Sequence, residues 1–140
     1  MVLAIDFDGT CVTHDFPKVG KDIGAIPILK ELVKNGHKLI LWTMRSDKKE
    51  VLTEHYEIYS KAGNYLTDAI NWFKENEIEL FGIQTNPTQH TWTKSPKAYA
   101  DIFIDDAGIG TPLTFDNDYS NKPFVNWEQI KIILKHKGLV

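Results

Sequence analysis

Two kinds of hydrophobic pattern alternate along the 140 residues of the chain. Short apolar runs, which are typical of buried strands, lie at 2–5, 39–42, 80–84 and 102–104. Stretches in which apolar residues recur every three or four positions, as on one face of a helix, lie at about 25–34, at 65–75 and after 126. Strands that alternate with helices in this way predict an α/β fold with parallel strands.

The first part of the chain shows the clearest local signals. Ile26, Leu29 and Val33 have helical spacing, Pro27 suits a first helical turn, and Asn35-Gly36 predicts the helix end. The strands at 2–5 and 39–42 flank this helix, so the three elements form a βαβ unit with a right-handed crossover. The carboxyl ends of both strands then lie side by side. We therefore expect Thr43, which follows the second strand, near Asp6, which follows the first.

The other segments are less regular. Residues 11–24 predict a loop or small hairpin, and the composition of 85–96 predicts another loop. Helical spacing in the charged segment 47–63 predicts a short helix near the carboxyl ends of the strands. A weak strand is expected at 113–115. Asn126, with Gln129 three residues later, has the pattern of a capping box that begins the last helix.

Length and composition favour a single domain over residues 1–140. The net charge of −3 provides no global basic field for nucleic acid or anionic lipid. A single cysteine, Cys11, excludes an internal disulfide and suits a reducing cytoplasm. No apolar run approaches the ~20 residues of a membrane span, and the N-terminus has the pattern of a strand and not of a signal peptide. We expect a cytoplasmic protein without a membrane partner, and a homo-oligomer is a candidate state.

Acidic residues follow two of the predicted strands. Asp6 and Asp8 follow the first, with Gly9 and Thr10 after them, and Asp105-Asp106 follow the strand at 102–104. Parallel α/β sheets bind ligands outside the carboxyl ends of their strands. Two carboxylates about 4 Å apart repel by about 4 kcal/mol at an effective dielectric constant of about 20. A cation, a shared proton or solvent must relieve this repulsion, and hard oxygen ligands suit Mg²⁺.

These motifs resemble those of the haloacid dehalogenase superfamily of phosphohydrolases. The match consists of Asp-Phe-Asp-Gly-Thr at 6–10, Thr43 after Leu-Ile-Leu-Trp, Lys97, and Ile-Asp-Asp at 104–106. The motifs have the order and credible spacing of the family over the first three quarters of the chain. The resemblance implies a Rossmann-like three-layer sandwich with Mg²⁺ at the carboxyl ends of the strands.

The resemblance also implies roles for individual residues. Asp6 would be the nucleophile that forms an aspartyl-phosphate, and Asp8 the general acid and then the general base. Gly9, Thr43 and Lys97 would bind the phosphoryl oxygens. The metal ligands would be Asp6, the main-chain carbonyl of Asp8, Asp105 and Asp106, with Asp106 binding directly or through water. Because Asp8 must start protonated, its pKa is expected to rise above that of Asp6.

Some features depart from the family pattern or leave alternatives open. No large cap domain is present, because only the loop 11–24 and the insertion 47–63 follow the first two motifs. Lys94 competes with Lys97 for the phosphate-binding role. Arg45 could contact a substrate anion or form a surface salt bridge. His14 is expected to be a solvated loop residue, and Trp92 could stack on a substrate or pin its loop.

The expected activity is magnesium-dependent hydrolysis of a small phosphomonoester. A phosphatase for nucleotides or nucleic-acid ends is an alternative, suggested by the open site. A non-catalytic magnesium-binding or phospho-signalling module is an alternative of another class. In receiver domains of that class the phosphorylated aspartate ends the third strand, and here the third strand ends at Gln84-Thr85-Asn86. That difference argues against a receiver domain.

Overall fold

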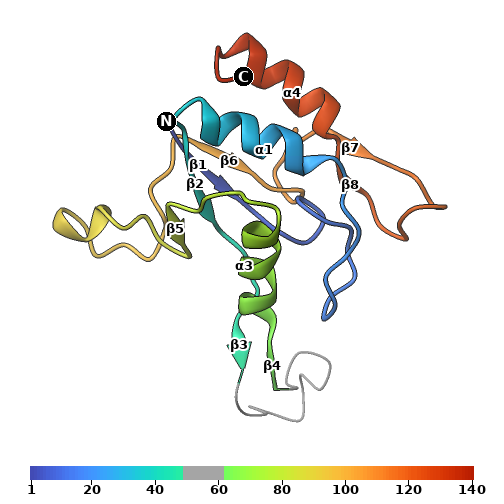
Figure 1. Cartoon of the computed structure of the whole chain (residues 1–140), viewed down its shortest axis with the longest axis horizontal. Helices are drawn as coiled ribbons and strands as arrows, with labels where there is room; N and C mark the ends of the chain where they lie inside the picture. The colour runs from blue at the N-terminus through green and yellow to red at the C-terminus, as the bar shows by residue number, and fades with distance from the viewer. Residues whose placement is uncertain (49–61) are drawn as a thin grey trace.

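A parallel sheet of four strands forms the centre of the structure, a computed structural model that describes residues 1–48 and 62–140 (Figure 1). The strands are β1 (Val2–Ile5), β2 (Lys38–Leu41), β5 (Gly82–Ile83) and β6 (Ile102–Ile104), in the spatial order β5-β2-β1-β6. All three pairings are parallel. The expected α/β class with a parallel sheet and no large cap domain is therefore confirmed.

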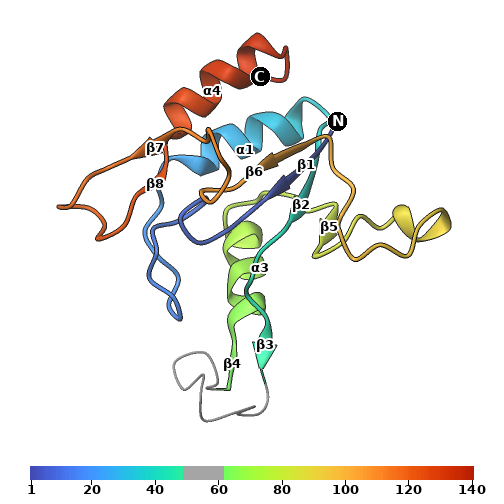
Figure 2. The same ribbon diagram turned by 180° about the vertical axis from the view of Figure 1, so that it is seen from behind.

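Within the described ranges, three α-helices cover the sheet. They are α1 (Ala25–Lys34), α3 (Tyr65–Glu75) and α4 (Trp127–His136). Figures 1 and 2 show α1 and α3 on the same face of the sheet, and α4 beside α1. The bounds of α1 and α3 agree with the sequence prediction, and the side chain of Asn126 accepts a hydrogen bond from the backbone N–H of Gln129 at 3.0 Å, as the capping box predicts.

The hydrophobic core lies between this helical layer and one face of the sheet. Alternate strand residues Leu3, Ile5, Leu39 and Leu41 point into it, and none is exposed to solvent. The helices contribute mainly Leu29 and Leu32 from α1, Phe73 from α3 and Trp127 from α4. The predicted apolar positions Ile26 and Val33 of α1 are only partly buried, at the margin of the core, and so are Leu66 and Ile70 of α3. This packing fixes the strand ends that carry the polar residues.

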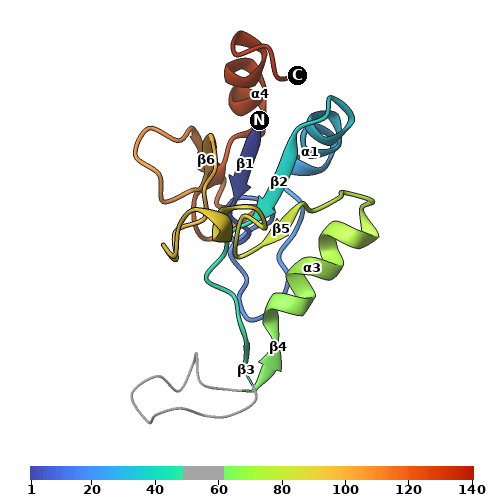
Figure 3. The ribbon, with the colours of Figure 1, turned by 90° about the vertical axis from the view of Figure 1, so that its left-hand side faces the viewer.

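Among residues 1–48 and 62–140, two short antiparallel strand pairs lie outside the main sheet. One joins β3 (Asp47–Lys48) to β4 (Gly63–Asn64), and it extends beyond the carboxyl end of β2 (Figure 3). The helix predicted over 47–63 is therefore wrong at residues 47–48 and at residue 63, which belong to strands. Residues 49–61 of that prediction lie outside the described residues. The other pair joins β7 (Leu113–Thr114) to β8 (Phe124–Val125). The expected weak strand at 113–115 is thus present, and its partner strand was not predicted.

None of the helices in the described part of the chain combines the length and the apolar character that crossing a membrane requires.

Candidate metal and phosphate site

The register of the sheet sets three site residues side by side. Ile5 in β1 pairs with Leu41 in β2 and with Ile104 in β6. The next residues are Asp6, Trp42 and Asp105, and the backbone N–H of Asp6 donates to the carbonyl of Ile104 at 3.0 Å. The chain order also reverses here, because β2 and β5 lie on one side of β1 and β6 on the other. This is where open parallel sheets bind their ligands.

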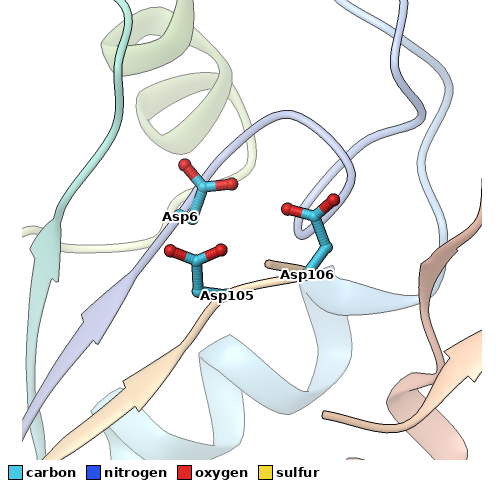
Figure 4. Close-up of side chains that lie close together, drawn as sticks. All are labelled: Asp6, Asp105 and Asp106. Atoms are coloured by element: carbon cyan, nitrogen blue, oxygen red, sulfur yellow. The ribbon is translucent and has the colours of Figure 1, made fainter. Parts of the chain in front are cut away.

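Three carboxylates meet at this position (Figure 4). Asp6 follows β1, Asp105 and Asp106 follow β6, and one oxygen from each lies within 4.8 Å of the others. The expectation that the acids after the first and fourth sheet strands converge is confirmed. Burial, and then the negative charges of Asp105 and Asp106, raise the pKa of Asp6 to about 7. Without a cation, the cluster therefore disfavours an ionised Asp6.

Thr10 links the two halves of the cluster. It is fully buried, its hydroxyl donates to a carboxylate oxygen of Asp6 at 3.2 Å, and the hydroxyl oxygen accepts the backbone N–H of Asp106 at 3.0 Å. The indole N–H of Trp127 donates to the Thr10 carbonyl at 2.6 Å, so α4 supports the turn. Buried Cys11 donates its thiol to the carbonyl of Asp6 at 3.3 Å. The residues after β1 thus hold Asp6 and Asp106 in place.

The turn after β1 requires glycine at position 9, where the backbone comes close to the side chains of His14 and Asp106. The φ of Gly9, 81°, lies in the left-handed region, and a Cβ there would lie 2.2 Å from Nε2 of His14 and 2.7 Å from Oδ2 of Asp106. His14 itself is bound to Oδ2 of Asp106 at 2.9 Å. The expectation that His14 is a solvated loop residue is therefore wrong. His14 contacts the acidic cluster across a sequence separation of 92 residues.

A pocket opens beside the cluster. It is lined by Asp6, Trp42, Thr43, Met44, Gln84 and Asp105. Thr43 thus lies with Asp6, as the βαβ unit predicted. Gln84 was not predicted as a site residue. Its side-chain amide accepts from the Thr43 backbone N–H at 3.0 Å and donates to the carbonyls of Thr43 and Arg45, which fixes the turn after β2.

The side chain of Asp8 lies outside the three-carboxylate cluster, because Arg45 binds it. Nε of Arg45 donates to one oxygen at 2.6 Å, and Nη2 donates to the other at 2.7 Å. Arg45 is only 2% exposed. The surface salt bridge considered for Arg45 is therefore wrong, because the side chain is buried. The pair is a buried bidentate ion pair.

Neither candidate lysine lines the pocket with Asp6. The ammonium of Lys97 lies 5.5 Å from the centre of the Phe103 ring, in a separate hollow that Trp92 and Tyr99 also line. Lys94 is exposed. Trp92 is 63% exposed and packs edge-on against the ring of Tyr99. The expected phosphate contact of Lys97 is therefore not seen.

The donor set suits a hard divalent cation. Asp6, Asp105 and Asp106 offer carboxylate oxygens, the ligands that Mg²⁺ prefers, and no His or Cys belongs to this cluster of described residues. The raised pKa of Asp6 also favours a cation at this position, because a bound cation would stabilise the ionised carboxylate of Asp6. The residues therefore fit Mg²⁺.

The chain is similar to a solved structure of a conserved protein from Bacteroides thetaiotaomicron. The two chains are 31% identical, and their structures superpose with a TM-score of 0.70. The match covers 98% of this chain and 91% of the other. No family model and no curated protein matches the chain.

Proposed function

The chain belongs to the same family as the conserved protein of Bacteroides thetaiotaomicron, and from the site that this fold assembles we propose that it is a magnesium-dependent phosphatase of the haloacid dehalogenase type. The observation that carries the proposal is the convergence of Asp6, Asp105 and Asp106 beside a pocket that also contains Thr43. Acids that follow β1 and β6, with a hydroxyl after β2, are the arrangement that the sequence motifs predict.

Asp6, Asp105 and Asp106 would hold Mg²⁺, which would neutralise charge on the acids and on a phosphoryl group and so reduce their repulsion. The hydroxyl of Thr43, which lines the same pocket, would bind a phosphoryl oxygen. Gln84 supports this role, since it holds the backbone of Thr43 through two hydrogen bonds.

In the first step, a carboxylate oxygen of Asp6 attacks phosphorus, and the bond from phosphorus to the leaving oxygen breaks. The leaving oxygen keeps the electron pair of that bond and, when it is an alkoxide, takes a proton from Asp8. In the second step, water attacks the aspartyl-phosphate and gives its proton to Asp8. The bond from phosphorus to Asp6 breaks, its electron pair returns to the Asp6 carboxylate, and phosphate is released.

The test is a panel of sugar phosphates, nucleotides and phosphorylated oligonucleotides, with phosphate release measured in the presence of MgCl₂. We expect at least one class to be hydrolysed, and we expect loss of that activity with EDTA and in Asp6→Asn. Lys131→Met is the matched control, because Lys131, in the middle of α4, forms an exposed ion pair with Glu31 of α1 and does not belong to the site. Full activity in Asp6→Asn, or no hydrolysis of any class by the unaltered chain, would contradict the proposal.

A further inference from the structure

Arg45 is the only arginine in a chain that carries 16 basic residues of the Lys or Arg type. It lies two residues after Thr43, and its side chain is 1% exposed. A guanidinium binds a carboxylate through two parallel hydrogen bonds, whereas a lysine ammonium has no planar pair of donors. The single arginine of the chain is therefore buried beside a carboxylate, that of Asp8, which accepts two parallel hydrogen bonds from the guanidinium.

Every N–H of the Arg45 guanidinium has an acceptor within the protein. Two go to the Asp8 carboxylate, and the other three go to the main-chain carbonyls of Lys18 (2.6 Å), Pro17 (3.4 Å) and Tyr65 (3.4 Å). A guanidinium has five N–H donors, so this set uses all of them. Arg45 thus has no donor left for a substrate phosphate.

Two aromatic rings also hold the guanidinium. Its central carbon lies 5.1 Å from the centre of the Phe7 ring and 5.2 Å from that of Phe16. Phe7 stands between Asp6 and Asp8 in the sequence. The orientation of Arg45 is therefore fixed by the main chain and by the same turn that carries the two aspartates.

These contacts determine what Asp8 can do. Each of its oxygens accepts one N–H of Arg45, which leaves one lone pair on each oxygen for a further hydrogen bond. The Asp8 side chain is 19% exposed, so solvent reaches it. A carboxylate that Arg45 holds in this way still has a lone pair on each oxygen with which to accept a proton from water.

We propose that Arg45 is a positioning residue that holds the Asp8 carboxylate as the general base for hydrolysis of the aspartyl-phosphate. The inference rests on the proposed phosphatase function. In this step the attacking water forms a bond to phosphorus and gives its proton to Asp8. The bond from phosphorus to the Asp6 oxygen breaks, its electrons return to Asp6, and Arg45 keeps Asp8 oriented throughout.

The inference predicts a selective kinetic defect. With 4-nitrophenyl phosphate the leaving group departs as a phenolate, so formation of the aspartyl-phosphate needs no proton from Asp8. We expect Arg45→Lys to retain a burst of nitrophenolate, close to one per enzyme, while steady-state turnover falls by about 10- to 100-fold. Phe16→Leu, which removes one ring from the guanidinium, should show the same pattern to a smaller extent. Lys131→Met is the control for both.

Failure of the proposed function and failure of the Arg45 proposal give different results in these assays. No activity in the unaltered chain, or full activity in Asp6→Asn, would overturn the function and the inference with it. If Asp6→Asn is inactive while Arg45→Lys turns over normally, or loses burst and turnover equally, Arg45 has no selective role and the inference alone fails.

Hydrogen exchange of the Arg45 side chain tests the pairing with Asp8 in the unaltered chain, without an activity measurement and even if the Arg45 variant does not fold. Because the chain has one arginine, ¹⁵N-arginine labelling gives one Nε–H signal, which belongs to Arg45. We expect this proton to exchange slowly with water in the unaltered chain and rapidly in Asp8→Asn. Rapid exchange in the unaltered chain would overturn the pairing and the proposal.

Discussion

The hydroxyl of Thr10 donates to Asp6 at 3.2 Å while it accepts the backbone N–H of Asp106 at 3.0 Å. One buried side chain therefore connects the acid after β1 to the acids after β6. These acids are 100 residues apart in the sequence, and the hydroxyl satisfies polar groups that have little access to water.

Thr10→Val should destabilise the fold, because it leaves the N–H of Asp106 without its acceptor and removes one of the hydrogen bonds to the Asp6 carboxylate. We expect a loss of about 1–3 kcal/mol in the free energy of unfolding, measured with urea. Thr10→Ser keeps the hydroxyl and should lose less than about 1 kcal/mol. Equal losses in the two variants would show that the hydrogen bonds contribute little.

The raised pKa of Asp6 predicts a pH-dependent stability in the absence of metal. Between the unfolded pKa of 3.8 and the folded pKa of about 7, the folded chain holds a proton that the unfolded chain has released. The contribution of Asp6 to stability is therefore fully present below about pH 4, and it is lost as the pH rises through 7. The shift corresponds to at most about 4 kcal/mol.

Urea unfolding in EDTA at pH 4.5 and pH 8 measures this effect. Asp6→Asn, which cannot ionise, should be more stable than the unaltered chain at pH 8, and the difference should shrink at pH 4.5. A difference that is independent of pH would contradict the buried, mutually repelling arrangement of the acids.

Magnesium binding should depend on Asp105 and not on the side chain of Asp8. Calorimetric titration at pH 8 should show at least about 10-fold weaker binding in Asp105→Asn, which removes one carboxylate of the cluster. Asp8→Asn should bind Mg²⁺ nearly as the unaltered chain does, because Arg45 holds that side chain apart from the cluster. Equal weakening in both variants would place Asp8 in the metal site.

Gly9→Ala should be destabilising for two reasons. The backbone φ of 81° is strained for alanine, and the new Cβ would meet His14 and Asp106. We expect a loss of about 1–3 kcal/mol in the free energy of unfolding. His14→Ala should restore part of this loss in the double variant, because the closest clash is with His14. No restoration would mean that backbone strain and the contact with Asp106 set the cost.

The helices and the main strands were predictable because their signals are local. Asn35 and Gly36 end α1, and Gly36 has a φ of 81°. Asn126 caps α4, and Gly138, with a φ of 70°, follows its end. Strand β8 was missed because Phe124 and Val125 form too short a run to predict a strand without the partner β7.

The acidic cluster was predictable because parallel strands bring their carboxyl ends together, whereas the positions of Arg45 and His14 depend on the paths of loops. Arg45 reaches Asp8 across 37 residues, and His14 reaches Asp106 across 92. The only available signal was that Arg45 is the single arginine of the chain. Lys97 was expected beside the acids because it lies close to β6 in the sequence. That short separation does not determine the path of its loop, which places the ammonium of Lys97 beside the Phe103 ring.

The central claim is that Asp6, Asp105 and Asp106 share one divalent ion and that Asp6 accepts the phosphoryl group. A crystal structure of the full chain, grown with MgCl₂ and beryllium fluoride as a phosphoryl mimic, tests it most directly. We predict a magnesium about 2.1 Å from oxygens of Asp6 and Asp105, with the beryllium fluoride attached to Asp6 and facing Thr43. A magnesium bound elsewhere, or a mimic attached to any other residue, would contradict the claim.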